Sequence, residues 1–136
     1  MIDGVYSGLP APVLKPGNDD VIGIWYMSES TVRFLDYEGY TAKSHELVFQ
    51  EDGTFRAVNV PYLTETFDTY QQEETTVLSG TWKIGKDVNN DWAVILTSNI
   101  TGTPTIVAFL DFEQSDRPYT LRLWISEMGG LVFERK

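Results

Sequence analysis

Three groups of residues carry side chains that could do chemistry: the single histidine, an aspartate-rich loop and a pair of strand carboxylates. His45 is the one conventional candidate for a general base, and it lies between Ser44 and Glu46. A Ser-His-acid triad fails on geometry there, because adjacent residues of a strand point to opposite faces. We therefore interpret His45 as an ordinary residue at the start of a strand.

The aspartate-rich loop runs from Asp87 to Asp91 and matches the first five positions of a calcium-binding loop. The sixth position holds Trp92, where glycine is needed, and the twelfth holds Ser98, where a bidentate glutamate is needed. The segment is therefore interpreted as a polar hairpin loop, and no metal site is assigned to it.

Asp111 and Glu113 lie on one face of an expected strand and could pair as a general acid and a general base. No neighbouring motif identifies a reacting centre for them, so a solvated face is the favoured interpretation. No glycine-rich phosphate-binding loop follows a strand. Because no catalytic constellation is left, the sequence predicts a protein that is not an enzyme and that has no cofactor.

Charge and composition narrow the class of protein further. The chain has 136 residues, with 20 acids against 10 bases, and a net charge of -10. This excess argues against partners that are nucleic acids or anionic membranes. The absence of cysteine excludes disulfides, thiolate metal sites and cysteine nucleophiles. The first residues lack the basic and apolar regions of a signal peptide, so a cytoplasmic location is expected.

The acidic residues are distributed unevenly. Residues 57–116 hold nine acids and two bases, a net charge of -7, whereas residues 117–136 have a net charge of +2. An acidic patch of this kind accelerates association with a basic partner through electrostatic steering.

Hydrophobic alternation predicts short strands through most of the chain after an extended arm at residues 1–20. The alternating segments, rich in aromatic and β-branched residues, are 21–27, 46–50, 54–60, 92–97, 105–112, 119–125 and 131–135. Gly53 can supply the positive φ of a hairpin turn at residues 51–54. The pattern indicates one all-β domain at residues 21–136, a sandwich or a barrel.

Two stretches fit this pattern poorly. Residues 28–44 stay unassigned, with a strand and a long loop as one interpretation. Pro61 could open a short helix with Leu63, Phe67 and Tyr70 at helical spacing, although the threonines around them disfavour a helix.

A short motif occurs twice, as Gly23-Ile24-Trp25 and, 57 residues later, as Gly80-Thr81-Trp82. The repetition indicates two roughly four-stranded halves. In each half, the glycine would let the tryptophan pack across a barrel end.

The first copy of this motif resembles the Gly-x-Trp signature of lipocalin and fatty-acid-binding (calycin) barrels. Further segments resemble small bacterial lipocalin-like domains, namely residues 47–55, 60–61, 79–82 and 131–134. The resemblance implies an antiparallel up-and-down barrel of about eight to ten strands, with Trp25 and Trp82 near barrel ends. The Thr-Asp-Tyr signature of secreted lipocalins is absent, so the resemblance implies the fold more than ligand carriage.

Barrels similar to fatty-acid-binding proteins also serve as small acidic immunity proteins against toxins delivered between bacteria, as in contact-dependent inhibition. The favoured hypothesis is therefore an immunity protein that binds and neutralises a basic toxin. A nuclease toxin must be basic to hold nucleic acid, so an acidic inhibitor can occupy the same surface. The alternative is a carrier of a small hydrophobic ligand, such as a fatty acid, in the barrel interior.

We expect the partner-facing surface in the acidic segment that follows Pro61. Proline interrupts strand pairing, so this segment should lie outside the barrel wall or over its mouth. Its carboxylates and rings would supply charge-assisted hydrogen bonds and buried anchors. The predicted partner-binding residues are Tyr62, Glu65, Phe67, Asp68, Tyr70, Glu73 and Glu74, with Asp111 and Glu113 as weaker additions.

Overall fold

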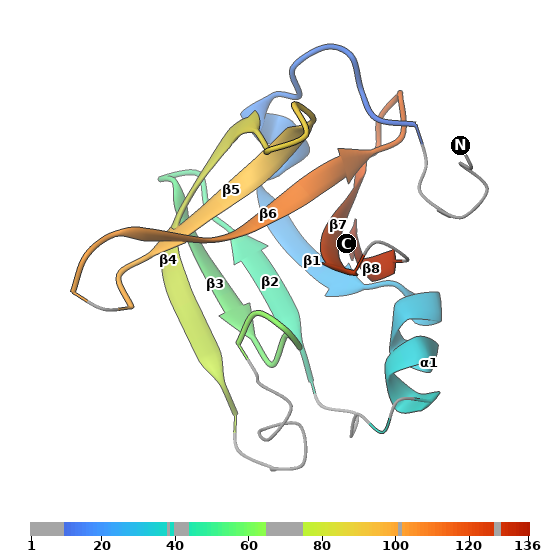
Figure 1. Ribbon diagram of the computed structural model, residues 1–136, viewed down its shortest axis with the longest axis vertical. Coiled ribbons are helices and arrows are strands. Elements are labelled where there is room, and N and C mark those ends of the chain that lie inside the picture. Colours follow the sequence, from blue (N-terminus) through green and yellow to red (C-terminus); the bar gives the residue numbers. More distant parts are fainter. Residues whose placement is uncertain (1–9, 38, 40–43, 65–74, 101, 127–128) are drawn as a thin grey trace.

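The computed structural model is a closed antiparallel barrel in which each strand pairs with its neighbours along the chain, and β1 also pairs with β8 (Figure 1). The strands are β1 (Gly23–Met27), β2 (Glu46–Phe49), β3 (Thr54–Val58), β4 (Val77–Lys86), β5 (Trp92–Ser98), β6 (Thr105–Glu113), β7 (Thr120–Ser126) and β8 (Gly129–Arg135). An α-helix, α1 (Glu29–Tyr37), and a 3-10 helix, η2 (Asn18–Asp20), accompany them. The structure describes residues 10–37, 39, 44–64, 75–100, 102–126 and 129–136. The predicted all-β up-and-down barrel is confirmed, and the architecture is compatible with a calycin-like fold.

The barrel interior is filled by large apolar side chains from alternate residues of the strands. Fully buried examples are Trp25, Leu47, Phe49, Leu96, Leu110, Phe112, Leu121, Leu131 and Phe133. Aromatic rings meet edge to face, with centroids 5.8 Å apart for Phe49 and Trp82 and 5.4 Å apart for Phe112 and Tyr119. An eight-stranded barrel is just wide enough for its own side chains to fill it.

The two Gly-x-Trp motifs place buried tryptophans as predicted. Trp25 donates from Nε1 to the Val21 carbonyl at 2.8 Å, and Trp82 donates to the Gln50 carbonyl at 3.0 Å. Both acceptors belong to segments at the same end of the barrel. The second motif lies inside β4, after three strands, so the expected division into two four-stranded halves is wrong.

Gly80 is required where β4 passes β5. A Cβ on this residue would lie 2.0 Å from the backbone oxygen of Thr97 and 2.9 Å from the ring of Phe55. Neither a backbone carbonyl nor a packed core ring can retreat that far, so only glycine fits here.

The up-and-down order gives the barrel two distinct ends, which we name from their contents. The helix end carries α1 and the β3–β4 and β5–β6 connections. The arm end carries the described N-terminal residues 10–22 and the β2–β3, β4–β5 and β6–β7 turns (Figure 1). At the arm end, the predicted hairpin turn is confirmed, with Gly53 at a φ of 88° and the Thr54 amide bound to the Asp52 side chain.

Helix α1 occupies part of the stretch that the sequence left unassigned. Its start is capped, because the Ser28 hydroxyl accepts from the Thr31 amide at 3.3 Å. The Thr31 hydroxyl in turn accepts from the Val132 amide at 3.0 Å, and Leu35 is buried. These contacts dock the helix against β8. In the other doubtful stretch, residues 62–64 form a turn, and the remainder of the expected Pro61 helix lies outside the described residues.

The described part of the N-terminal arm packs on the barrel. Arg117 donates from Nε to the Asp20 carboxylate, and Arg135 donates from Nη1 to the Asp19 carbonyl at 2.6 Å. Pro12 and Pro16 are buried. The arm therefore covers the arm end of the barrel. Among the described residues, no helix has the length and apolar character needed to cross a membrane.

Candidate functional site

The predicted partner-binding residues separate into three sets in the structure. Tyr62 is 56% exposed at the start of the β3–β4 connection, with a φ of 67°. Asp111 and Glu113 lie near the end of β6, at the arm end, so the barrel separates them from Tyr62. The remaining predicted residues, Glu65, Phe67, Asp68, Tyr70, Glu73 and Glu74, lie outside the described residues.

The base of the β3–β4 connection is held together by a polar network. The Asn59 side chain accepts from the Thr76 amide at 2.9 Å and donates to the Ser44 carbonyl at 2.7 Å. The hydroxyls of Thr64 and Thr76 lie 2.8 Å apart. Asn59 is 5% exposed and takes a φ of 51°, a conformation that asparagine tolerates better than most residues. The network joins the two ends of the connection at the rim of the barrel.

Exposed apolar side chains also occur around the helix end. Tyr37 at the end of α1 is 89% exposed, and Phe34 is 44% exposed. Val77 at the start of β4 and Ile106 at the start of β6 are also exposed. Exposed aromatic residues of this kind can anchor a protein interface.

The expectation that Asp111 and Glu113 lie on a solvated face is wrong. They share the outer face of β6, as their spacing predicts, but Asp111 is 9% exposed and Glu113 is 5% exposed. Glu113 accepts from Nε of Arg122 at 2.8 Å, and both side chains of this ion pair are buried. A carboxylate so enclosed is not available to a partner, so its burial argues against the predicted partner contact.

A line of polar and aromatic contacts on the outer wall connects these two carboxylates. The Arg122 guanidinium lies 4.8 Å from the ring centroid of Trp124, and Trp124 donates from Nε1 to Oδ2 of Asp111 at 2.9 Å. This line of contacts therefore runs from Glu113 through Arg122 and Trp124 to Asp111. The other carboxylate oxygen of Asp111, Oδ1, is buried and accepts from no amide, hydroxyl or amine in the described part of the chain.

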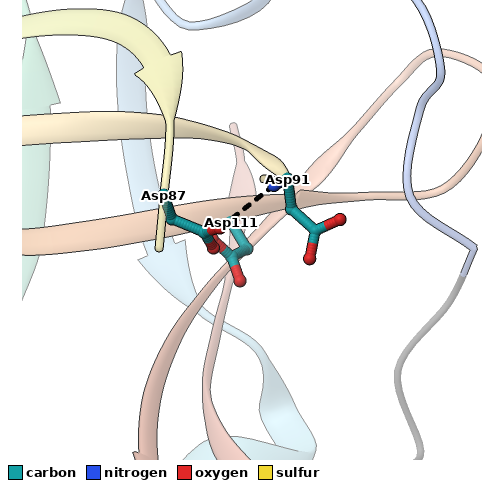
Figure 2. Close-up of side chains that lie close together, drawn as sticks. All are labelled: Asp87, Asp91 and Asp111. Carbon is teal, nitrogen blue, oxygen red and sulfur yellow. Dashed lines mark hydrogen bonds between the residues drawn. The ribbon is translucent and has the colours of Figure 1, made fainter. Parts of the chain in front are cut away.

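Asp111 meets two carboxylates of the β4–β5 turn, Asp87 and Asp91 (Figure 2). One carboxylate oxygen from each of the three lies within 4.8 Å of the other two. Asp87 shapes the turn, because its Oδ1 accepts from the backbone amides of Asn89 at 2.8 Å and Asp91 at 3.0 Å. The turn is the polar hairpin that the sequence predicts, but its carboxylates gather on a third aspartate from β6.

Crowding of the three carboxylates shifts their pKa values in different directions. Burial raises the pKa of Asp111 to about 8, and a hydrogen bond with Asp87 and the charges of Asp87 and Asp91 add to the rise. Burial and the charge of Asp87 also raise the pKa of Asp91. Burial opposes ionisation of Asp87 too, but its hydrogen bonds with Asp111 and the turn amides outweigh burial and lower its pKa. Near neutral pH, Asp111 is the carboxyl that carries a proton.

Sequence reasoning found both halves of this cluster but did not join them. The loop from Asp87 to Asp91 lacks the glycine and the glutamate of a calcium-binding loop. No neighbouring motif in the sequence indicated what Asp111 would contact. The missing signal is strand register: Ala93 pairs with Asp111 across β5 and β6, which places the end of the turn beside Asp111. Counting back along the β5–β6 hairpin from its connection would have indicated this proximity.

His45 has a structural role, as the sequence predicts. Its Nε2 accepts from the Met27 amide at 2.9 Å, and its ring meets Tyr26 edge to face at 5.9 Å. The residue lies directly before β2 and fastens that strand to the end of β1.

Comparisons with known proteins add no family to this picture. No protein-family model matches the chain, and no curated protein or solved structure matches it significantly. The fold and the site therefore have to be interpreted from the chain's own residues.

Proposed function

We propose that the chain is a non-enzymatic acidic binding protein, an immunity protein that binds and neutralises a basic bacterial toxin of the nuclease type. The observation that carries the proposal is the helix end of the barrel. There, a hydrogen-bonded base holds the β3–β4 connection, and the exposed Tyr62 leads into the most acidic stretch of the sequence, residues 65–74.

Charge supports a basic partner. Residues 65–74 contain Glu65, Asp68, Glu73 and Glu74 and no base, and the whole chain carries a net charge of -10. Such a surface attracts a basic protein over distances of about 10 Å at moderate salt. A nuclease surface that binds phosphates offers the complementary charge.

The packed interior supports protein binding over carriage of a hydrophobic ligand. Carriers keep an open cavity lined with apolar side chains. Here the interior positions of the described strands hold the buried aromatic residues Trp25, Phe49, Phe112 and Phe133. The buried leucines Leu47, Leu96, Leu110, Leu121 and Leu131 lie beside them. A fatty acid would have to displace this core, and close-packed cores resist such displacement.

The test is the association kinetics of a charge-reversed variant, Asp68→Lys with Glu73→Lys. The probe is a purified basic toxin domain encoded beside the gene for this chain. The variant should associate at least about tenfold more slowly at low ionic strength, and the difference should shrink at high salt. Its circular dichroism spectrum and unfolding midpoint should match those of the unaltered protein.

A matched control reverses two charges at the arm end, the end of the barrel opposite Tyr62. Glu51→Lys with Asp116→Lys changes the net charge from -10 to -6, the same as the test variant, and both residues are exposed in arm-end turns. If the control slows association as much as the test variant, net charge rather than the helix end governs binding. If neither variant changes the kinetics, the acidic segment is not the partner surface.

A further inference from the structure

The three carboxylates at the arm end come from two segments that are distant in sequence. Asp87 and Asp91 flank the β4–β5 turn, and Asp111 lies on the outer face of β6. Figure 2 shows the Asp87 and Asp111 carboxylates next to each other, with Asp91 joined to Asp87 through its backbone amide. The fold therefore brings three carboxyl groups together in a small volume.

A second observation concerns the buried oxygen of Asp111. The side chain is fixed by Trp124, which donates to Oδ2, whereas no amide, hydroxyl or amine of the described residues donates to Oδ1. The hydrogen bond between Asp111 and Asp87 exists only while one of these two carboxyls holds a proton. Asp111 as a whole is 9% exposed. Buried acceptors in folded proteins almost always have a partner, and an oxygen in this state is able to bind a water molecule or a cation.

The nearby cations do not neutralise the cluster. Lys86 is close enough to act on Asp87 and Asp91, but its ammonium donates to the Asn90 carbonyl at 3.3 Å and lies 4.4 Å from the ring centroid of Trp92. Arg122 is bound to Glu113. Among the described residues, one ammonium thus acts on Asp87 and Asp91, and it is engaged elsewhere.

We propose that Asp87, Asp91 and Asp111 bind one calcium ion at the arm end of the barrel. An all-oxygen ligand set selects a hard cation. Ligand oxygens on opposite sides of a calcium ion lie up to about 4.8 Å apart, a span that accommodates all three carboxylate oxygens. Asp87 and Asp91 are partly exposed, so water can complete the coordination. This site lies at the end of the barrel opposite Tyr62, and it does not depend on the proposed function.

The ion would also explain why the turn keeps so many acids close together. It would bridge the β4–β5 hairpin to β6 through Asp111, and so tie the turn to the barrel wall. Protein without the ion should therefore be less stable than protein with it, because a ligand that binds only the folded state stabilises that state.

The test uses terbium, which occupies calcium sites and emits when a nearby tryptophan is excited. Trp124 is hydrogen-bonded to Asp111, so its ring is close enough to sensitise the emission of an ion at this site. Full-length protein freed of metal with a chelator is titrated with TbCl₃ and then with CaCl₂, in about 0.15 M KCl to screen non-specific attraction. We expect saturable terbium emission that calcium displaces with a Kd on the order of 10⁻⁴ to 10⁻³ M, the range of weaker calcium sites.

Two variants and one control localise the binding. Asp111→Asn and Asp91→Asn should each weaken calcium binding at least about tenfold, because each removes a charged ligand. Asp91→Asn should keep the native fold, because the Asp91 side chain makes no hydrogen bond within the described structure. A loss of calcium binding in this variant is therefore not explained by misfolding. Asp116→Asn removes an exposed carboxylate at the same end and should leave the affinity within about twofold.

The outcomes separate clearly. Equal terbium binding by Asp91→Asn and the unaltered protein would overturn the proposal, as would the absence of saturable emission. Displacement by MgCl₂ at the same concentration as CaCl₂ would overturn the assignment to calcium, because magnesium requires a smaller octahedral shell. A calcium-dependent rise in unfolding temperature that disappears in Asp111→Asn would support it.

Discussion

Replacing Asp111 with asparagine should stabilise the metal-free protein at alkaline pH. In the folded state, burial and the neighbouring Asp87 raise the pKa of Asp111 from 3.8 to about 8. The folded protein therefore holds a proton that the unfolded chain has released. The stability that this proton supports is complete below about pH 4, and it is lost as the pH rises through 8.

The size of the effect follows from this shift. Each tenfold change in proton affinity is about 1.4 kcal/mol, so the rise from 3.8 to about 8 sets a ceiling of roughly 6 kcal/mol at high pH. Asp87 offsets part of this cost, because the shared hydrogen bond lowers its pKa. We expect a net loss of about 2 kcal/mol in the free energy of unfolding between pH 5 and pH 9. The pKa of Asp91 is also raised, so its ionisation lowers the stability of the folded protein in every variant that retains it.

Asparagine removes the titration but keeps most of the geometry. Its amide oxygen can accept from Trp124, and its NH₂ can donate to Asp87. At pH 9, Asp111→Asn should be about 2 kcal/mol more stable than the unaltered protein, whereas at pH 5 the two should agree within about 1 kcal/mol.

The assay is urea unfolding followed by circular dichroism from pH 5 to pH 9, with a chelator present throughout. Asp116→Asn is the control, since this exposed aspartate should leave the pH profile unchanged. A profile for Asp111→Asn that is parallel to that of the unaltered protein would refute the reasoning, because it would show that Asp111 is ionised in the folded state.

Three further changes test the barrel itself, all by urea unfolding. Gly80→Ala should destabilise the protein by about 3 kcal/mol or prevent folding, because the added Cβ would overlap a β5 carbonyl. Gly129→Ala is the matched control, since a Cβ at this position would have no neighbouring atom within 4 Å. Glu113→Leu should cost roughly 3–5 kcal/mol by leaving Arg122 buried and unpaired, whereas the double change Glu113→Leu with Arg122→Met should cost far less; equal costs would contradict the ion-pair argument. Asn59→Ala should cost about 2 kcal/mol and speed hydrogen exchange of the amide that its side chain binds; unchanged exchange would show that the network is dispensable.

Much of the fold was predictable because its signals are local. Alternation of apolar residues in β5, β6 and β7 reflects the two faces of each strand, and the strands lie where the alternation predicts them. The turn before Thr54 was also predictable, because a glycine with positive φ is a property of a few adjacent residues. Burial of Trp25 followed from the resemblance of its motif to calycin barrels.

Helix α1 was missed because its stability comes from distant contacts. Thr31 and Val32 are weak helix formers, and the segment has few of the residues that stabilise an isolated helix. Its capping by Ser28 is local, but its position depends on the bond from Thr31 to Val132, about a hundred residues away in sequence.

The sequence by itself determined the strand faces, the acidic character and the separate presence of an aspartate turn and of strand carboxylates. Only the tertiary structure decided which carboxylates meet. Glu113 became a buried partner of Arg122, and Asp111 joined Asp87 and Asp91, although nothing in the local pattern distinguishes the two strand carboxylates. The physical reason is that alternation assigns a residue to a face, whereas strand register and the packing of the outer wall decide its neighbours.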